Sequence, residues 1–211
     1  MNESSFLKPL ANASSFNNSY LLMRHGESEA NVSGVIVSDP AIGCERFGLT
    51  EHGLQQISAS VNRFTGKPIT QIVCSDFLRT MQTAQLVAEI LHLPQPQQEI
   101  GLRERFFGNW EGMSADHYEK IWQRDEMGQE FDDRVEQPQA VLQRGVDVIS
   151  KLETQYQGQV ILLISHGDML QILRTLVTGI LPHKHRSLTH HQTAEIKHLV
   201  SQDEKQPKHS N

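Results

Sequence analysis

The sequence predicts an α/β protein, a three-layer α/β/α sandwich around a mostly parallel central sheet. Two observations lead to this fold class. Apolar runs of strand length alternate with amphipathic helical patterns through most of the 211 residues. The run VILLI at residues 160–164 is continuously apolar, which is typical of a parallel strand that helices cover on both faces. This alternation favours helices packed on both sides of one sheet.

The first half of the chain supplies two expected strands, at residues 19–23 and 69–74, and two expected helices. Thr50 is a suitable cap for the first helix, because its hydroxyl can accept a hydrogen bond from the first turn. The apolar side chains of that helix are Leu54, Ile57, Val61 and Phe64. Ser75 or Asp76 is expected to cap the second helix. Its apolar stripe is Phe77, Met81, Ala84, Ala88 and Leu91.

The second half supplies helical cover within residues 115–135, a helix at about 138–156 and the central strand at 160–164. Asp168 is expected to cap the helix that follows this strand, and Gly179 and Pro182 to end it. A last strand is expected at residues 193–200. The inward side chains of the two helices are Val141, Leu142, Val146, Ile149 and Leu152, then Met169, Ile172, Leu173, Leu176, Val177 and Ile180.

The chain length favours one domain with short extensions. We expect a flexible leader at residues 1–18, a single domain at 19–200 and a disordered tail at 201–211. Within the domain, residues 105–138 are expected to form a cap-like insertion. The first residues lack both a basic start and an uninterrupted apolar stretch, so we expect no signal peptide.

Composition excludes several functions. The net charge of -6 argues against broad binding to nucleic acid or to acidic membranes, both of which need a basic surface. No apolar run is long enough to span a bilayer. The two cysteines, Cys44 and Cys74, lack a paired motif and suit a reducing cytoplasm, so we expect a cytoplasmic protein. The sequence leaves the oligomeric state open, a homodimer included.

Charged and polar groups follow three of the expected strands. They are Arg24-His25-Gly26, then Ser75 with Arg79, and Ser165-His166-Gly167. Ligands of open α/β sheets bind at the carboxyl ends of the strands, so these groups should share one cleft. Arg79 lies off the apolar stripe of its helix, which keeps it beside that strand end. Two arginines and two histidines in one pocket favour an anionic ligand, and the arginine fork suits a phosphoryl group.

A neutral imidazole can attack phosphorus when a backbone carbonyl holds its other ring nitrogen and fixes the tautomer. We assign this nucleophilic role to His25. His166 is expected to donate to the phosphoryl oxygens. The glycines after the two histidines, Gly26 and Gly167, are expected to let backbone N–H groups approach the anion.

Phosphoryl transfer also needs an acid that protonates the leaving oxygen. The loop LRERFFGNWEG at residues 102–112 offers Glu104 and Glu111 for this role, and Glu27 also lies near the nucleophile in sequence. Burial and the negative charge of phosphate would raise the pKa of such a carboxyl group and keep its proton available.

Four stretches of the chain resemble the signature blocks of the histidine phosphatase superfamily, also called the phosphoglycerate mutase-like family. They are LLMRHGESEAN, SDFLRTMQTA, LRERFFGNWEG and LLISHGDML, in the family's order and spanning about residues 19–200. The resemblance implies that His25 is phosphorylated, that Glu104 rather than Glu111 is the proton donor, and that neither a metal nor a cofactor is used. The phosphate pocket that it implies consists of Arg24, Asn31, Arg79 and His166.

The function expected from these features is hydrolysis of a small phosphorylated metabolite by a phosphatase. The closest alternative is a cofactor-dependent phosphoglycerate mutase, whose longer chains carry insertions for which this sequence lacks room. A further alternative is a non-catalytic module that binds a phosphorylated ligand. The stretch FDDRVEQPQAVLQR at residues 131–144 departs from the P-x-G-E-S-like segment frequent in the family, which leaves the substrate open.

Two other groups of side chains receive a structural interpretation. Phe106, Phe107 and Trp110 are expected to pack beneath the loop rather than bind substrate. Five histidines fall within residues 183–198, HKHRSLTHHQTAEIKH. No acidic or cysteine ligand accompanies them at a firm spacing, so we expect surface histidines rather than a zinc site.

Overall fold

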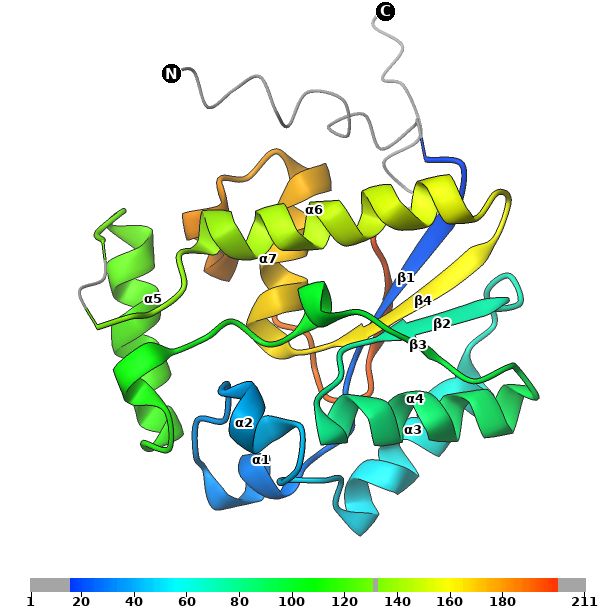
Figure 1. Cartoon of the computed structure of the whole chain (residues 1–211), viewed down its shortest axis with the longest axis horizontal. Helices are drawn as coiled ribbons and strands as arrows, with labels where there is room; N and C mark the ends of the chain where they lie inside the picture. The colour runs from blue at the N-terminus through cyan, green and yellow to red at the C-terminus, as the bar shows by residue number, and fades with distance from the viewer. Residues whose placement is uncertain (1–15, 131–132, 201–211) are drawn as a thin grey trace, which may run out of the picture.

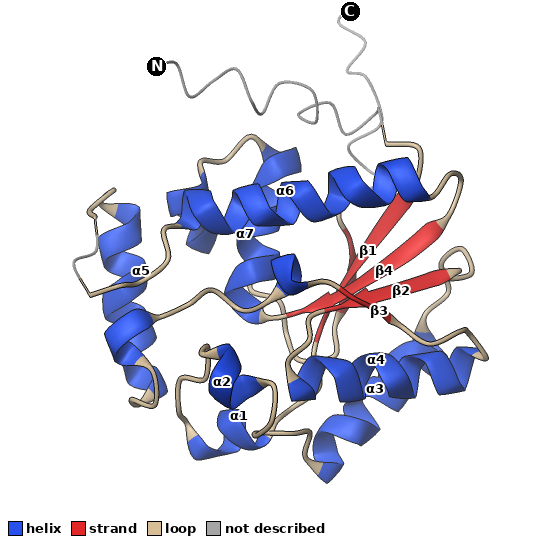
Figure 2. Cartoon of the chain, viewed as in Figure 1, coloured by secondary structure: helices blue, strands red, loops and turns tan. Residues whose placement is uncertain are grey.

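The computed structural model describes residues 16–130 and 133–200, and a five-stranded sheet lies at its centre. The strand order is β3-β2-β4-β1-β5, and all pairs are parallel except β1 with β5. Figure 2 shows this sheet between helices, which confirms the α/β sandwich predicted from the sequence. The strands are β1 Ser19–Arg24, β2 Gln71–Cys74, β3 Gln97–Gln98, β4 Val160–Ser165 and β5 Ile196–His198.

Two helical layers cover the sheet (Figure 1). On one side lie α6 Pro138–Gln155 and α7 Gly167–Thr178, packed on strand residues such as Leu22 and Leu163. On the other lie α3 Glu51–Arg63 and α4 Leu78–Leu91, packed on Leu21 and Leu162. Successive strand residues face opposite layers, which is why the strands of the central pair are apolar at nearly every position.

The expected start of α3 is confirmed, because the Thr50 hydroxyl accepts a hydrogen bond from the Gly53 N–H at 3.0 Å. One member of its expected apolar stripe is wrong: Leu54 is 37% exposed. Gly53 takes the inward place instead, since the backbone of Glu27 packs so closely that a side chain would not fit there.

The expected caps of α4 and α7 are wrong. Phe77 occupies the cap position of α4, and Asp76 pairs with Arg103 instead. The cap position of α7 belongs to His166, whose side chain does not cap the helix; the Met169 N–H of the first turn donates to Glu104 instead. Asp168 lies in its first turn, where its carboxylate is engaged by Trp122. In both cases a tertiary partner displaces the local interaction that the sequence suggests.

A third layer of short elements covers one end of the sheet. It contains α1 Glu29–Ser33, α2 Pro40–Gly43 and α5 Tyr118–Glu126, together with the 3-10 turns η4 Gly108–Trp110 and η5 Ala115–His117. Ile36, Phe107, Ile121 and Val135 form its small apolar core. The expected cap-like insertion at 105–138 provides most of this layer, and the expected helical cover at 115–135 is realised as the shorter α5.

The ends of the chain differ from expectation where they can be compared. Residues 16–18 were assigned to the leader, yet the Asn17 N–H donates to Glu153 on α6 at 2.6 Å and the Asn18 amide donates to the same carboxylate at 2.9 Å. The rest of the leader and the tail lie outside the described residues. The expected strand at 193–200 is only three residues long, as β5. Within the described part of the chain, no helix is long and apolar enough to cross a membrane.

Candidate active site

A cavity of about 260 Å³ opens at the carboxyl ends of the parallel strands. The register aligns Arg24 with Ser165, which brings the first and fourth strand ends to one level. Six of the predicted residues line the cavity: Arg24, His25, Asn31, Arg79, Glu104 and Gly167. A larger hollow of about 870 Å³ between α3 and β5 contains none of them. The predicted residues from separate strand ends therefore meet at the smaller cavity.

His25 has the geometry of a nucleophile. Its Nδ1 lies 2.7 Å from the carbonyl oxygen of Gly26, a contact in which the ring nitrogen must donate. The lone pair is therefore on Nε2, which faces the Arg79 Nε–H at 3.2 Å. Burial, followed by the charges of Arg79 and Arg24, holds the pKa of His25 well below its usual value. The ring is thus neutral at physiological pH, as a nucleophile requires.

Arg79 links the two histidines at the floor of the site. Its Nη2 donates to the carbonyl of Val37 and lies 3.0 Å from Nδ1 of His166. Its Nη1 is buried and has no protein partner among the described residues. An unpaired guanidinium N–H beside the nucleophile is suited to an anionic oxygen, because a buried donor without an acceptor is costly.

Arg24 has a second unpaired donor, its buried Nε. Its Nη1 contacts His190 Nε2 at 2.9 Å, while Arg186 contacts the other ring nitrogen, Nδ1, at 3.2 Å. Burial and the neighbouring arginines lower the pKa of His190 to about 4, so its ring is neutral and can accept at only one nitrogen. The ring therefore accepts a hydrogen bond from only one of the two arginines.

His166 is placed differently from the prediction. It is fully buried and does not line the cavity; its Nε2 lies 3.0 Å from the Ser75 hydroxyl, and its Nδ1 faces Arg79. Both ring nitrogens have protein partners, and the expected donation to phosphoryl oxygens stays a prediction. In this arrangement His166 orients Arg79, the group that reaches the cavity.

The two glycines after the histidines also differ. The Gly26 N–H donates to the Thr83 hydroxyl at 3.2 Å, so the expected approach of this N–H to the anion is wrong. Gly167 begins α7 and lines the cavity, and its N–H has no protein partner among the described residues. Only Gly167 therefore offers a backbone donor, at the positive end of a helix.

Asn31 lies at the rim, on α1. Its Oδ1 accepts from the backbone N–H and the hydroxyl of Ser28, both at 3.0 Å. This pair of bonds fixes the side chain and leaves its amide N–H₂ as the group available to a ligand. The predicted contact with phosphate is compatible with this position.

The three carboxyl groups considered as the proton donor lie in different places. Glu104 lines the cavity with His25. Glu111 accepts from the N–H and hydroxyl of Ser38, at 2.7 and 2.6 Å, and does not line the cavity. Glu27 accepts from the Thr50 hydroxyl at 2.7 Å, also outside the cavity lining. Position alone therefore favours Glu104.

The surroundings of Glu104 suit a group that holds a proton. Burial, followed by the negative charge of Asp168, raises its pKa above the usual value. Its Oε1 accepts from the backbone N–H groups of Arg105 and Met169, at 2.9 and 3.2 Å. Its Oε2 has no hydrogen-bond partner among the described residues, which leaves that oxygen to carry the proton.

Several lining residues were missed by sequence reasoning. Ser28, Tyr118, Trp122, Asp168 and His190 all line the cavity. Tyr118 and Trp122 stack at 5.2 Å, and they lie one helical turn apart on α5. The four-residue spacing of these aromatic residues was the available sequence signal. It does not show that their face of α5 turns toward the cavity. Phe107 and Trp110 pack in the cap layer, as expected, and Phe107 also borders the cavity.

The prediction of surface histidines within residues 183–198 is wrong for several of them. His185 and His191 are fully buried rather than on the surface, and His190 lines the cavity. Buried backbone acceptors hold the first two, because His185 donates to the Pro182 carbonyl and His191 faces that of Glu195. Within residues 16–130 and 133–200, no group of three or more potential ligands is arranged to hold a metal ion.

Comparison with known proteins identifies the family. A family model described as histidine phosphatase superfamily (branch 1) matches residues 20–210. The chain belongs to this superfamily. The resemblance inferred from the four sequence blocks is thereby confirmed.

Similar proteins of the family include several phosphatases. The adenosylcobalamin/alpha-ribazole phosphatase of Salmonella typhimurium is 30% identical over 164 residues, 72% of this chain and 75% of the relative. The probable phosphoglycerate mutase GpmB of Serratia proteamaculans is 29% identical, over 79% of this chain and 78% of the relative. These similarities identify the chain as a phosphohydrolase of the superfamily.

Solved structures agree with the fold. The alpha-ribazole phosphatase from Shigella flexneri superposes with a TM-score of 0.67 at 27% identity, covering 84% of this chain and 88% of that one. Bacillus stearothermophilus YhfR superposes with a TM-score of 0.72 at 22% identity, covering 85% and 89%. The latter similarity supports the fold alone.

Proposed function

We propose that this phosphatase hydrolyses a small phosphomonoester through a phosphohistidine on Nε2 of His25. The observation that carries the proposal is the fixed tautomer of this ring. The Nδ1–H donates to the Gly26 carbonyl, so the lone pair lies on Nε2, which borders the cavity and accepts from the Arg79 Nε–H. A nucleophile, an anion pocket and a carboxyl group thus surround one small space.

The first step forms a bond between His25 Nε2 and phosphorus and breaks the bond between phosphorus and the leaving oxygen. Glu104 gives its proton to that oxygen. The charge on the phosphoryl oxygens is stabilised by the unpaired N–H groups of Arg24 and Arg79 and by the Gly167 N–H. Asn31 supplies a further donor at the rim.

The second step returns the enzyme to its starting state. Ionised Glu104 takes a proton from a water molecule, which attacks phosphorus and breaks the bond to His25 Nε2. Inorganic phosphate leaves with the new oxygen, and the imidazole regains its lone pair. The same carboxyl group therefore serves as acid and then as base.

The substrate is small, because the cavity of about 260 Å³ lies below the range common for drug-sized ligands. The alcohol part of the ester would lie against Tyr118 and Trp122, which suits a leaving group with a flat or apolar face. An alpha-ribazole phosphate, named for the relatives from Salmonella typhimurium and Shigella flexneri, is the first compound to assay.

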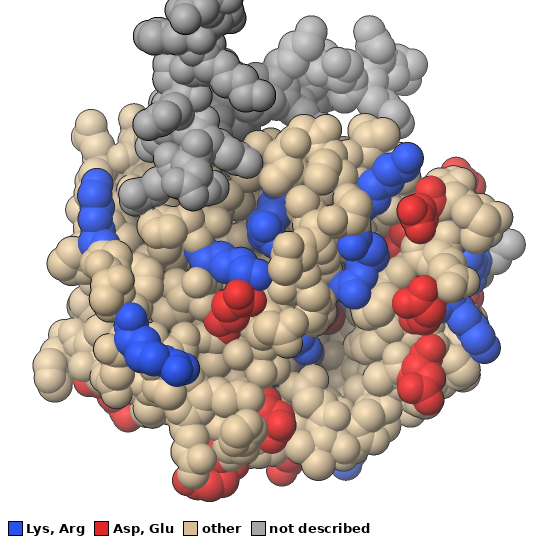
Figure 3. Space-filling view, turned by 180° about the vertical axis from the view of Figure 1, so that it is seen from behind, with Lys and Arg blue, Asp and Glu red and all other residues tan. Residues whose placement is uncertain are grey.

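A cytoplasmic location and a preference for small molecules over nucleic acid complete the proposal. Cys44 and Cys74 are both free. On the face seen in Figure 3, basic and acidic side chains are interspersed rather than gathered in one basic surface. A homodimer stays a prediction.

The test is a screen of the purified protein against phosphorylated metabolites, repeated with Glu104→Gln. We expect release of phosphate from at least one small monoester. For an alkyl ester, Glu104→Gln should lower kcat/KM by about 10²- to 10³-fold, because the alkoxide then leaves unprotonated. For 4-nitrophenyl phosphate, whose leaving group needs no proton, the loss should stay below about tenfold.

Equal losses on the two esters would contradict the role of Glu104. Conversion of 3-phosphoglycerate that depends on a bisphosphoglycerate primer would favour the mutase. Tight binding of phosphate with no turnover of any ester would favour a binding module.

A further inference from the structure

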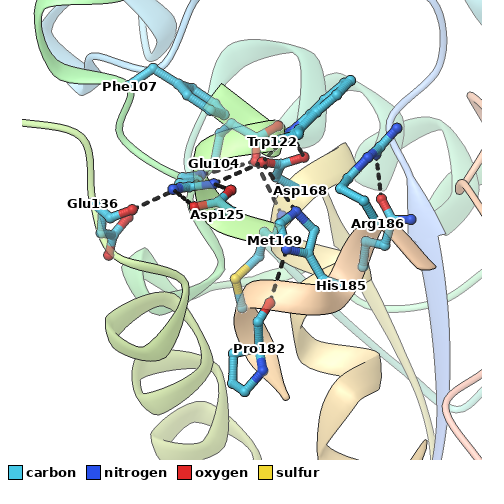
Figure 4. Close-up of polar contacts among 12 residues, drawn as sticks. Glu104, Phe107, Trp122, Asp125, Glu136, Asp168, Met169, Pro182, His185 and Arg186 are labelled. Atoms are coloured by element: carbon cyan, nitrogen blue, oxygen red, sulfur yellow. Dashed lines mark hydrogen bonds and ion pairs between the residues drawn. The ribbon is translucent and has the colours of Figure 1, made fainter. Parts of the chain in front are cut away.

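The network of Asp168 beneath the cavity has no part in the mechanism given above. Asp168 is 4% exposed, lies in the first turn of α7 and lines the cavity. Figure 4 shows its carboxylate between Glu104, Trp122 and His185. A buried carboxylate at this place needs an explanation, because it carries negative charge toward a site that binds an anion.

Three groups surround the carboxylate of Asp168. The Trp122 Nε1–H is 3.0 Å from each carboxylate oxygen. Arg105 Nη1 lies 3.5 Å from Oδ2, and His185 Nε2 lies 3.7 Å from the same oxygen. Because His185 donates its Nδ1–H to the Pro182 carbonyl, a proton on Nε2 as well would complete an ion pair.

Asp125 and the Glu136 carbonyl hold Arg105 in place. It is fully buried, donates to both oxygens of Asp125 at 2.5 and 2.8 Å, and donates through Nε to the Glu136 carbonyl at 2.7 Å. Asp168 is therefore surrounded by donors that favour its charged form. Burial opposes that charge, but the adjoining His185, the charge of Arg105 and the hydrogen bond of Trp122 keep the pKa of Asp168 below its usual value.

Glu104 adjoins this anion. Its Oε1 accepts the N–H of Met169, the residue after Asp168, so both carboxyl groups lie at the start of α7 and border one cavity. Two carboxyl groups in one site do not ionise equally, and the proton stays on the one with the weaker cationic support. Asp168 has the guanidinium of Arg105 at 3.5 Å and the Trp122 N–H at 3.0 Å, whereas Oε2 of Glu104 has no hydrogen-bond partner within the described chain.

Other charged groups also face Glu104. Arg79 on α4 and Arg24 on β1 line the same cavity, and their positive charges favour ionised Glu104. Tyr118 on α5 lines it too, and Arg144 on α6 donates to the Glu104 backbone carbonyl at 3.1 Å. When phosphate occupies the pocket, its charge offsets that of the arginines, and the nearby anion of Asp168 then decides the protonation of Glu104.

We propose that Asp168 is a positioning residue for the proton: held as an anion by Trp122 and Arg105, it keeps the transferable proton on Glu104 until the leaving oxygen takes it. This inference rests on the proposed function. Asp168 is then a negatively charged neighbour of Glu104 and not a second proton donor, because N–H donors already occupy its carboxylate oxygens.

The test compares Asp168→Asn with Asp125→Asn, a matched control. Both changes remove one buried carboxylate that contacts Arg105, but Asp125 does not line the cavity. The pH profile of kcat/KM is measured for an alkyl phosphate and for 4-nitrophenyl phosphate. With Asp168→Asn, the loss of activity on the alkyl ester at rising pH should begin about one pH unit lower, since Glu104 ionises more easily. Asp125→Asn should cause a much smaller displacement.

For 4-nitrophenyl phosphate no displacement is expected in either variant, and Asp168→Glu should restore the wild-type profile. An unmoved alkyl profile in Asp168→Asn would overturn the inference. So would a loss on the alkyl ester that is equal at every pH, because Asp168 would then be the donor itself. Wild-type hydrolysis by His25→Ala would instead overturn the proposed function, a separate result.

A second measurement does not depend on the folding of Asp168→Asn. Carboxyl ¹³C NMR of the wild-type protein follows each glutamate as pH changes, and Glu104→Gln assigns the resonance of Glu104. The inference predicts that Glu104 titrates above the ordinary glutamate value of about 4.3. Titration at or below that value would overturn it.

Discussion

The two histidine turns of this protein have nearly the same sequence and the same place in the fold. Arg24-His25-Gly26 ends β1 and Ser165-His166-Gly167 ends β4, and these strands are neighbours in parallel register. Their rings meet edge to face, with centroids 5.4 Å apart. These shared features alone do not distinguish the two histidines, and the family resemblance is what favours His25 as the nucleophile.

The position of the two rings separates the two turns. Both rings have protein partners on both nitrogens: His25 donates to the Gly26 carbonyl and accepts from Arg79, whereas His166 lies between Ser75 and Arg79. Of the two, His25 lines the cavity and His166 does not. The chain after His25 continues as a loop, and the chain after His166 enters α7 at once. The His25 turn thus supplies a reactive nitrogen, and the His166 turn orients Arg79 and supplies the N–H at the start of α7.

The largest difference between the turns should appear when each histidine is removed. His25→Ala should lower kcat for 4-nitrophenyl phosphate by at least about 10⁴-fold, because no nucleophile remains. Phosphate release is measured under saturating substrate. Protection of the variant against heat by inorganic phosphate would show that the anion pocket has survived. Residual turnover near that of the wild type would refute the assignment of the nucleophile.

His166→Gln should be less harmful, with a loss of about 10²-fold. Arg79 loses one of its three protein contacts, so the guanidinium is held less well at the phosphoryl oxygens. The loss should be similar for alkyl and aryl phosphates, since the leaving group is not involved. A loss as large as that of His25→Ala would show that His166 takes a direct part in the chemistry.

The glycines of the two turns should differ in stability. A Cβ at Gly26 would meet the Gly53 carbonyl oxygen at 2.7 Å, whereas one at Gly167 has its nearest contact at 3.6 Å. Gly26→Ala should therefore lower the free energy of unfolding by about 2 kcal/mol. Gly167→Ala should leave it unchanged or raise it by up to about 1 kcal/mol. Urea denaturation measures both values, and equal effects would contradict the packing described for Gly26.

The smallest effect is expected at Ser75, whose hydroxyl faces Nε2 of the second histidine and also accepts from the Phe77 N–H at 3.3 Å. Ser75→Ala removes the partner of His166 Nε2 and should lower kcat/KM by about fivefold, the equivalent of one hydrogen bond. Phosphohistidine should still form on His25. A loss of 10³-fold or more would mean that the second turn does more than orient Arg79.

The fold and much of the site could be predicted from the sequence. Continuous apolar runs identified β1, β2 and β4, and the polar residues after them had to meet because parallel strands end at one edge. His25, Arg24 and Arg79 follow from that rule. Glu104 follows from the family resemblance, and its position in the cavity agrees with the expected role.

The remaining site residues depend on tertiary packing that no local pattern encodes. Asp168 looked like a helix cap, but Trp122 and Arg105, which are distant in sequence, engage its carboxylate. The sequence predicted surface histidines in the stretch 183–198. In the structure His185 and His191 are buried, and each faces a backbone carbonyl of its own loop. In each case a partner brought by the fold replaced the interaction expected from the neighbouring residues.

The site of covalent phosphorylation distinguishes the two turns most directly. Wild-type protein is mixed with a phosphorylated substrate, quenched in alkali to preserve phosphohistidine, and examined by peptide mass spectrometry and ³¹P NMR. We expect the phosphoryl group on Nε2 of His25 and none on His166. Phosphate on His166, on Nδ1 of His25, or on neither histidine in an enzyme that turns over would contradict the proposed mechanism.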